Sequence, residues 1–185
     1  MQIKGSAVRS IPEFIKKHFP DCYKQWLHAL PESSRNILEN VIKSNEWYPL
    51  KDAGIIPTKT IGDICYSGDY HKGGWENGRF SADISLTGIY KFYVRIGNPK
   101  HIISRASRIF SAYYQPSEIS TNNWRDKSLK LVISKFDEPD PCIDARIGGW
   151  TERALEISGC KNVSVVVEKS LSNNDPVTQF DVRWT

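Results

Sequence analysis

The sequence predicts an α+β fold, in which a helical N-terminal half precedes a three- or four-stranded antiparallel sheet with one long helix between strands. Apolar residues follow helical spacing from the N-terminus to about Tyr114. Beyond that point the period changes, and apolar residues alternate as they do in strands with one buried face. A helical stripe separates two of these alternating segments. The length of 185 residues predicts a single domain over 1–185.

Three amphipathic helices are expected first. The first ends before Pro20, which cannot continue a helix, and Asp21 is expected to cap the second. The serines after Pro31 are expected to cap the third. His28 lies off the apolar face of the second helix and is expected to face solvent. The three buried faces are expected to hold Ile11, Phe14, Ile15 and His18, then Tyr23, Trp26, Leu27 and Leu30, then Ile37, Leu38, Val41 and Ile42.

The middle of the chain is less regular. Proline and glycine interrupt segment 47–66, which favours a broken helix. The polar, glycine-rich stretch SGDYHKGGWENG, residues 67–78, is expected to form a long surface loop. A further helix is expected over Ile89–Ile96, closed by Gly97.

The second half supplies the strands of the expected sheet. The alternating sets are Leu129, Leu131 and Ile133; Val163, Val165 and Val167; and Phe180, Val182 and Trp184. A short strand at Glu118–Ser120 is expected to fold onto Leu129–Phe136. The long helix lies between the first two sets, ends at Gly159, and has a stripe of Ile143, Ile147, Trp150, Ala154 and Ile157.

His101 opens another expected helix and is a candidate haem ligand. Asn98 is a good N-cap, and Pro99 fits the first helical position because its missing N–H costs nothing there. The apolar arc of that helix contains Ile102, Ile103, Ala106, Ile109, Phe110, Tyr113 and Tyr114. His101 falls on the opposite, polar side, so we expect it to face water rather than a buried haem.

Composition and charge exclude several classes of function. The net charge of +4 is spread along the chain without a basic block, so nucleic acid is not an expected partner. No apolar run reaches the roughly 20 residues that span a bilayer, and the N-terminus lacks a secretion signal, so we expect a cytoplasmic protein without membrane insertion. Four scattered cysteines without a CxxC pair favour free thiols over disulfides or zinc.

The chain shows no pattern of an enzyme. Neither a Ser/His/Asp arrangement, a catalytic carboxylate pair nor a phosphate-binding loop stands out. Its aromatic content, with 6 Trp, 8 Tyr and 7 Phe, fits either a large core or a cavity for an apolar ligand that tyrosine hydroxyls orient. For the second alternative, the candidate ligand-binding residues are Phe110, Tyr113, Tyr114 and Trp150.

A series of short motifs resembles a family of uncharacterised bacterial proteins. The motifs are KGSAVRSI, WYPL, GIYKFYVRIGNP, SAYYQP, GGWTERALEISGCKNVSVVVEK and DPVTQFDVRW. That family is distantly related to 4-vinyl-reductase-type domains, haem-nitric-oxide-binding (H-NOX-like) sensors and TRAPP transport subunits. The resemblance implies an α+β fold, often dimeric, with a pocket for a hydrophobic small molecule, and a role as a sensor or an assembly module.

Two functional elements of these relatives are missing. Haem-binding relatives hold the propionates with a Tyr-x-Ser-x-Arg strand, and the nearest equivalent here is Val132, Ser134 and Phe136. Zinc-containing relatives use three cysteines, of which Cys142 matches one. Ser170 and Thr178 stand at the other two positions, and one thiolate cannot build a structural zinc site. The resemblance therefore implies the scaffold without a metal or other cofactor.

The leading hypothesis is a metal-free cytoplasmic sensory or ligand-binding domain for an apolar or aromatic small molecule. It would act through a signalling partner or through a homodimer interface. Two alternatives stay open: a protein-interaction module whose pocket is filled by side chains, and a haem-based gas sensor.

Overall fold

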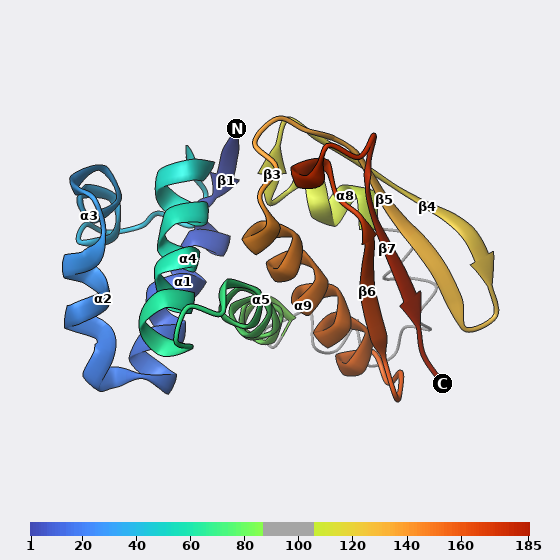
Figure 1. Ribbon diagram of the computed structural model, residues 1–185, viewed down its shortest axis with the longest axis horizontal. Helices are drawn as coiled ribbons and strands as arrows, with labels where there is room; N and C mark the ends of the chain where they lie inside the picture. The colour runs from blue at the N-terminus through green and yellow to red at the C-terminus, as the bar shows by residue number, and fades with distance from the viewer. Residues whose placement is uncertain (87–105) are drawn as a thin grey trace.

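A computed structural model of the chain describes residues 1–86 and 106–185, and it confirms the α+β class. Figure 1 shows the helices of the first half on one side and the larger sheet on the other, with α9 packed against the sheet. The α-helices are α1 (Gly5–His18), α2 (Tyr23–Ala29), α3 (Glu32–Leu38), α4 (Ile56–Cys65), α5 (Tyr70–Leu86), α8 (Ala106–Ser111) and α9 (Pro141–Ile157). The strands are β1 (Gln2–Lys4), β2 (Trp47–Pro49), β3 (Tyr114–Gln115), β4 (Ser117–Arg125), β5 (Ser128–Phe136), β6 (Ser164–Lys169) and β7 (Thr178–Arg183).

The first helices follow the predicted stripes, with two exceptions. Trp26 and Leu30 are buried, and His28 is exposed as expected. Val41, expected on a buried face, is 87% exposed, because α3 ends at Leu38 and helical spacing no longer applies beyond it. His18 is exposed at the end of α1, although its ring still packs against Phe14 at 5.0 Å between centroids. Asp21 lies within the 3-10 helix Pro20–Cys22 instead of capping α2 with its side chain.

A small three-stranded sheet in the order β2-β1-β3 was not predicted. Ile3 of β1 pairs with Tyr48 on one side and with Tyr114 on the other. Strands of two or three residues are too short to produce an alternating pattern. Segment 47–66 begins with β2, and the rest is a π-helix over Lys51–Ile55 that continues into α4, so the expected broken helix is confirmed apart from its first residues.

The prediction of a surface loop over residues 67–78 was wrong, because most of this stretch belongs to α5. Gly73, Gly74 and Gly78 are buried in it. A side chain at Gly74 would meet Cys142 of α9, and one at Gly78 would meet the backbone of Arg146 and Trp150. Gly74 and Gly78 thus allow α5 and α9 to approach closely, whereas Gly73 lies against Gly62 of α4.

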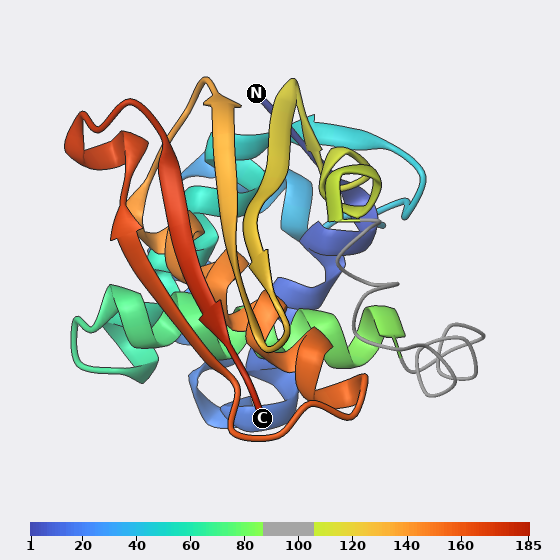
Figure 2. The same ribbon diagram turned by 90° about the vertical axis from the view of Figure 1, so that its right-hand side faces the viewer.

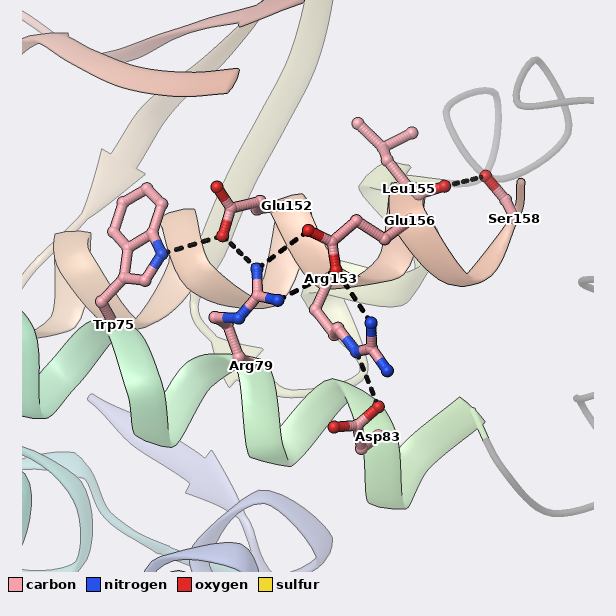
Figure 3. Close-up of polar contacts among 8 residues, drawn as sticks. All are labelled: Trp75, Arg79, Asp83, Glu152, Arg153, Leu155, Glu156 and Ser158. Atoms are coloured by element: carbon pink, nitrogen blue, oxygen red, sulfur yellow. Dashed lines mark hydrogen bonds and ion pairs between the residues drawn. The ribbon is translucent and has the colours of Figure 1, made fainter. Parts of the chain in front are cut away.

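Charged side chains border this helix pair along one side (Figure 3). Arg79 of α5 lies between Glu152 and Glu156 of α9, with an Nη2–Oε2 distance of 2.9 Å to Glu156. Arg153 of α9 donates in return to Asp83 of α5 at 2.8 Å. Ion pairs therefore run in both directions between α5 and α9.

The larger sheet has four antiparallel strands, where three or four were predicted, in the order β4-β5-β7-β6 (Figure 2). Leu129 pairs with Val182 and Leu131 with Phe180, so the alternating residues of β5 and β7 share the buried face. Helix α9 lies between β5 and β6 in sequence, as predicted, and Asp140 caps its N-terminus by accepting from the Cys142 N–H at 2.9 Å.

The strand β5 loses its alternation near its end. Glu118 pairs with Lys135 and Ile119 with Ile133, so Ser134 is an extra residue in the ladder. Phe136 consequently points into the core with Ile133, whereas Ser134 is exposed. Val132, Ser134 and Phe136 therefore do not share one face of the strand.

Candidate ligand-binding cavity

An apolar cavity of about 80 Å³ lies where α8, α9 and the larger sheet meet. Ile109 and Phe110 of α8 form one side, Ile147 and Ala154 of α9 another, and Leu131 of β5 belongs to the sheet side. The chain folds this way because the apolar stripe of α9 and the buried face of the sheet must cover each other.

All four predicted binding residues line this cavity. Phe110 and Tyr114 are buried, with ring centroids 5.2 Å apart, and Tyr113 and Trp150 face each other at 6.1 Å. Phe136 packs behind Tyr114 at 5.5 Å. The structure thus brings together residues from two distant segments, and their role in binding a ligand stays a prediction.

Arg146 of α9 also lines the cavity, and the sequence reasoning missed it. Its side chain is buried, with the residue 2% exposed, although arginine is rarely buried without a partner. The guanidinium donates from Nε to Asn77 Oδ1 at 2.7 Å and from Nη1 to the Tyr114 hydroxyl at 3.0 Å. Nη2 donates to the Ala7 carbonyl oxygen at 2.8 Å and to Ser10 Oγ at 3.1 Å.

The described residues offer no cluster for a metal ion. Among residues 1–86 and 106–185, no three His, Cys, Asp or Glu side chains lie close enough to hold one. Burial raises the pKa of the Cys142 thiol to about 12, so this thiol stays protonated at neutral pH. Ser170 donates to the buried Asp144 carboxylate, and Thr178 accepts from the Leu171 N–H at 3.0 Å. His101 lies outside the described residues.

The sequence matches no family model and no curated protein. Solved structures do match over nearly the whole chain. The Fe(II) unliganded H-NOX protein from K. algicida superposes with a TM-score of 0.71 at 10% identity, covering 99% of this chain and 97% of that one. An H-NOX protein from S. oneidensis in the Fe(II)NO state gives 0.72 at 9% identity, with 99% of both chains covered. A single-residue mutant of the T. tengcongensis H-NOX gives 0.63 at 12%, covering 99% and 97%.

This chain has the H-NOX fold. At identities near 10%, the likeness establishes the fold alone. It supports the H-NOX-like part of the resemblance, whereas the 4-vinyl-reductase and TRAPP relationships stay expectations. Within the described part of the chain, no helix is long and apolar enough to cross a bilayer.

Ile147→Ala tests whether α9 packs as described. We expect the variant to lose about 2–5 kcal/mol of unfolding free energy, because Ile147 is buried and its truncation enlarges the space beside it. Urea denaturation followed by circular dichroism measures the loss. His101→Ala, at the position that the sequence places on a polar face, should cost less than about 1 kcal/mol. Equal losses in the two variants would contradict the predicted helical phases.

Proposed function

We propose that this H-NOX-fold chain is a metal-free sensory or ligand-binding domain that holds a small apolar molecule. The observation that carries the proposal is the cavity of about 80 Å³, whose wall is mostly apolar and includes Phe110, Tyr113 and Trp150. An apolar cavity can retain a small guest without any covalent bond. The domain would transmit occupancy through a signalling partner or a second copy of the chain, in the cytoplasm and without catalysis.

A haem-based gas sensor is the second candidate. The solved neighbours favour it over the metal-free function, since two of those named above are the Fe(II) unliganded and Fe(II)NO forms of H-NOX proteins. The same fold could support the same use in this chain. Fold alone does not decide function, however, because function depends on the residues of the site.

The described residues do not fit a haem. Small-molecule sites usually enclose about 300–1,000 Å³, and this cavity has about 80 Å³. In the strand where haem-binding relatives carry Tyr-x-Ser-x-Arg, Val132 and Phe136 are buried apolar residues and Ser134 is exposed. Arg146 is the cation at the cavity wall, and it already donates to four protein acceptors.

One set of measurements separates these candidates. We expect purified protein to bind no stoichiometric metal by elemental analysis and to develop no Soret band after reconstitution with haemin. Native mass spectrometry of protein purified from its source should show a retained small molecule. A stable Soret band with one haem per chain would overturn the metal-free proposal in favour of the gas sensor.

Xenon tests the cavity independently of the natural ligand. We expect saturable changes in the ¹H–¹⁵N NMR spectrum under xenon pressure, because xenon occupies dry apolar cavities. Phe110→Trp places a larger ring at the wall and should weaken the response, while Lys72→Ala, on the exposed side of α5, should leave it unchanged. A wild-type protein without any saturable response would favour the protein-interaction module with a filled pocket.

A further inference from the structure

The arginine at the cavity wall lacks the countercharge that other arginines of the same helix pair have. Arg79 and Arg153 have side chains 25% and 34% exposed, and each contacts carboxylates of the facing helix. Arg146 is 2% exposed, yet within the described residues none of its partners is a carboxylate. Burying a cation with only neutral partners is costly, so a buried anion beside it would be favourable.

Some hydrogen-bond donors at this wall also have no acceptor among the described residues. A guanidinium has five N–H donors, and the four contacts of Arg146 leave one Nη1–H without an acceptor among the described residues. The Tyr114 hydroxyl accepts from Arg146, and its own proton has no acceptor in the same part of the chain. Trp150 Nε1 is buried and has no hydrogen-bond partner there either.

These three donors belong to residues that line one cavity. Among the described residues, the rest of the wall is apolar except for Ser81, Tyr113 and Thr151, whose hydroxyls both donate and accept. A buried N–H or O–H without an acceptor costs free energy comparable to a lost hydrogen bond. The wall therefore suits a ligand whose polar end only accepts hydrogen bonds and whose remainder is apolar.

Resting on the proposed ligand-binding function, we infer that the cavity takes a small monocarboxylate, whose carboxylate is held by Arg146, Tyr114 and Trp150. A carboxylate supplies the missing negative charge and accepts several hydrogen bonds, and bonds to charged groups are the stronger ones. Among the described residues of the wall, one cation and mostly apolar side chains match a single negative charge with a hydrocarbon tail. A cavity of about 80 Å³ limits that tail to a short chain, because benzene occupies one of roughly 150 Å³.

Isobutyrate and its neutral isostere isobutyramide are the probes that test this assignment. ¹H–¹⁵N NMR titrations of the wild-type chain should show saturable isobutyrate binding at least about tenfold tighter than isobutyramide binding, because only the anion neutralises Arg146. Tyr114→Phe and Trp150→Phe each remove one donor and keep an aromatic ring. Each should weaken isobutyrate binding about tenfold and change isobutyramide binding less. Arg146→Gln should abolish the preference for the anion.

The control is Arg9→Gln, which removes the same charge from an exposed side chain on α1 and should leave both affinities unchanged. Equal affinities for the two probes, or unaltered isobutyrate affinity in both Tyr114→Phe and Trp150→Phe, would overturn the inference even if Arg146→Gln does not fold. Xenon binding without isobutyrate binding would overturn it too, while leaving the proposed cavity function in place. Absence of both would overturn the cavity function as well.

Discussion

Gly78→Ala is expected to lower the free energy of unfolding by about 3 kcal/mol, near the upper end of the usual cost of overpacking. The added Cβ would lie well inside the van der Waals contact distance of the Arg146 carbonyl oxygen and 3.0 Å from the Trp150 amide nitrogen. Both obstacles are backbone atoms, so no side chain can rotate out of the way. Alanine is otherwise the better helix former by about 1 kcal/mol, which makes a loss of stability diagnostic of the close helix approach.

Urea denaturation followed by circular dichroism measures this effect. Gly149→Ala should behave in the same way, since its Cβ would meet the Trp75 carbonyl oxygen of the facing helix. Lys72→Ala is the matched control on α5, at an exposed position. A stabilised Gly78→Ala protein would show that α5 and α9 are farther apart than described. The position of Arg146 in the cavity wall would then also be wrong.

Trp26→Ala should cost about 3–5 kcal/mol, the range for removing a large buried aromatic side chain. Trp26 is fully buried between α2 and α4, and its Nε1 donates to the Pro57 carbonyl oxygen at 3.0 Å. The substitution therefore leaves both a cavity and a buried carbonyl without this donor. Helix α2 depends on this contact with α4, because it has only seven residues and is too short to be stable alone.

The matched control for Trp26→Ala is His28→Ala on the same helix, two residues away and exposed. It should change the unfolding free energy by less than about 0.5 kcal/mol. Thermal denaturation of both variants gives the comparison directly. If Trp26→Ala and His28→Ala unfold at similar temperatures, the buried face of α2 is wrong. That face was predicted from the spacing of Tyr23, Trp26, Leu27 and Leu30.

Periodicity was sufficient for α9, β5 and β7, which are long and have one buried face. The stripe of α9 and the alternation in β5 and β7 predicted the correct elements, because spacing along the chain determines which side chains share a face. Tyr113 and Tyr114 line the cavity too, although α8 ends at Ser111 and Tyr114 belongs to β3, so helical spacing did not determine their place. For Phe110 and Trp150, periodicity did predict an inward surface each. It could not show that the two surfaces meet.

The glycine-rich stretch of α5 shows why local pattern was insufficient elsewhere. Glycine in GGWENG is ambiguous, since it favours loops but also permits close packing of helices. A second GGW, at residues 148–150 in α9, was the available signal, and Gly74 and Gly78 do face that helix. Whether these glycines form a loop or a helix contact depended on α9, which lies some 70 residues away in the sequence.

By itself, then, the sequence determined the α+β class, the strand faces and the inward position of Phe110 and Trp150, since each of these follows from local spacing. Only the tertiary structure decided the place of Arg146. Its acceptors Asn77, Ala7 and Ser10 are 69, 139 and 136 residues distant in the chain. No periodic pattern relates such positions, because a buried charge is satisfied by groups that converge only when α1, α5 and α9 pack together.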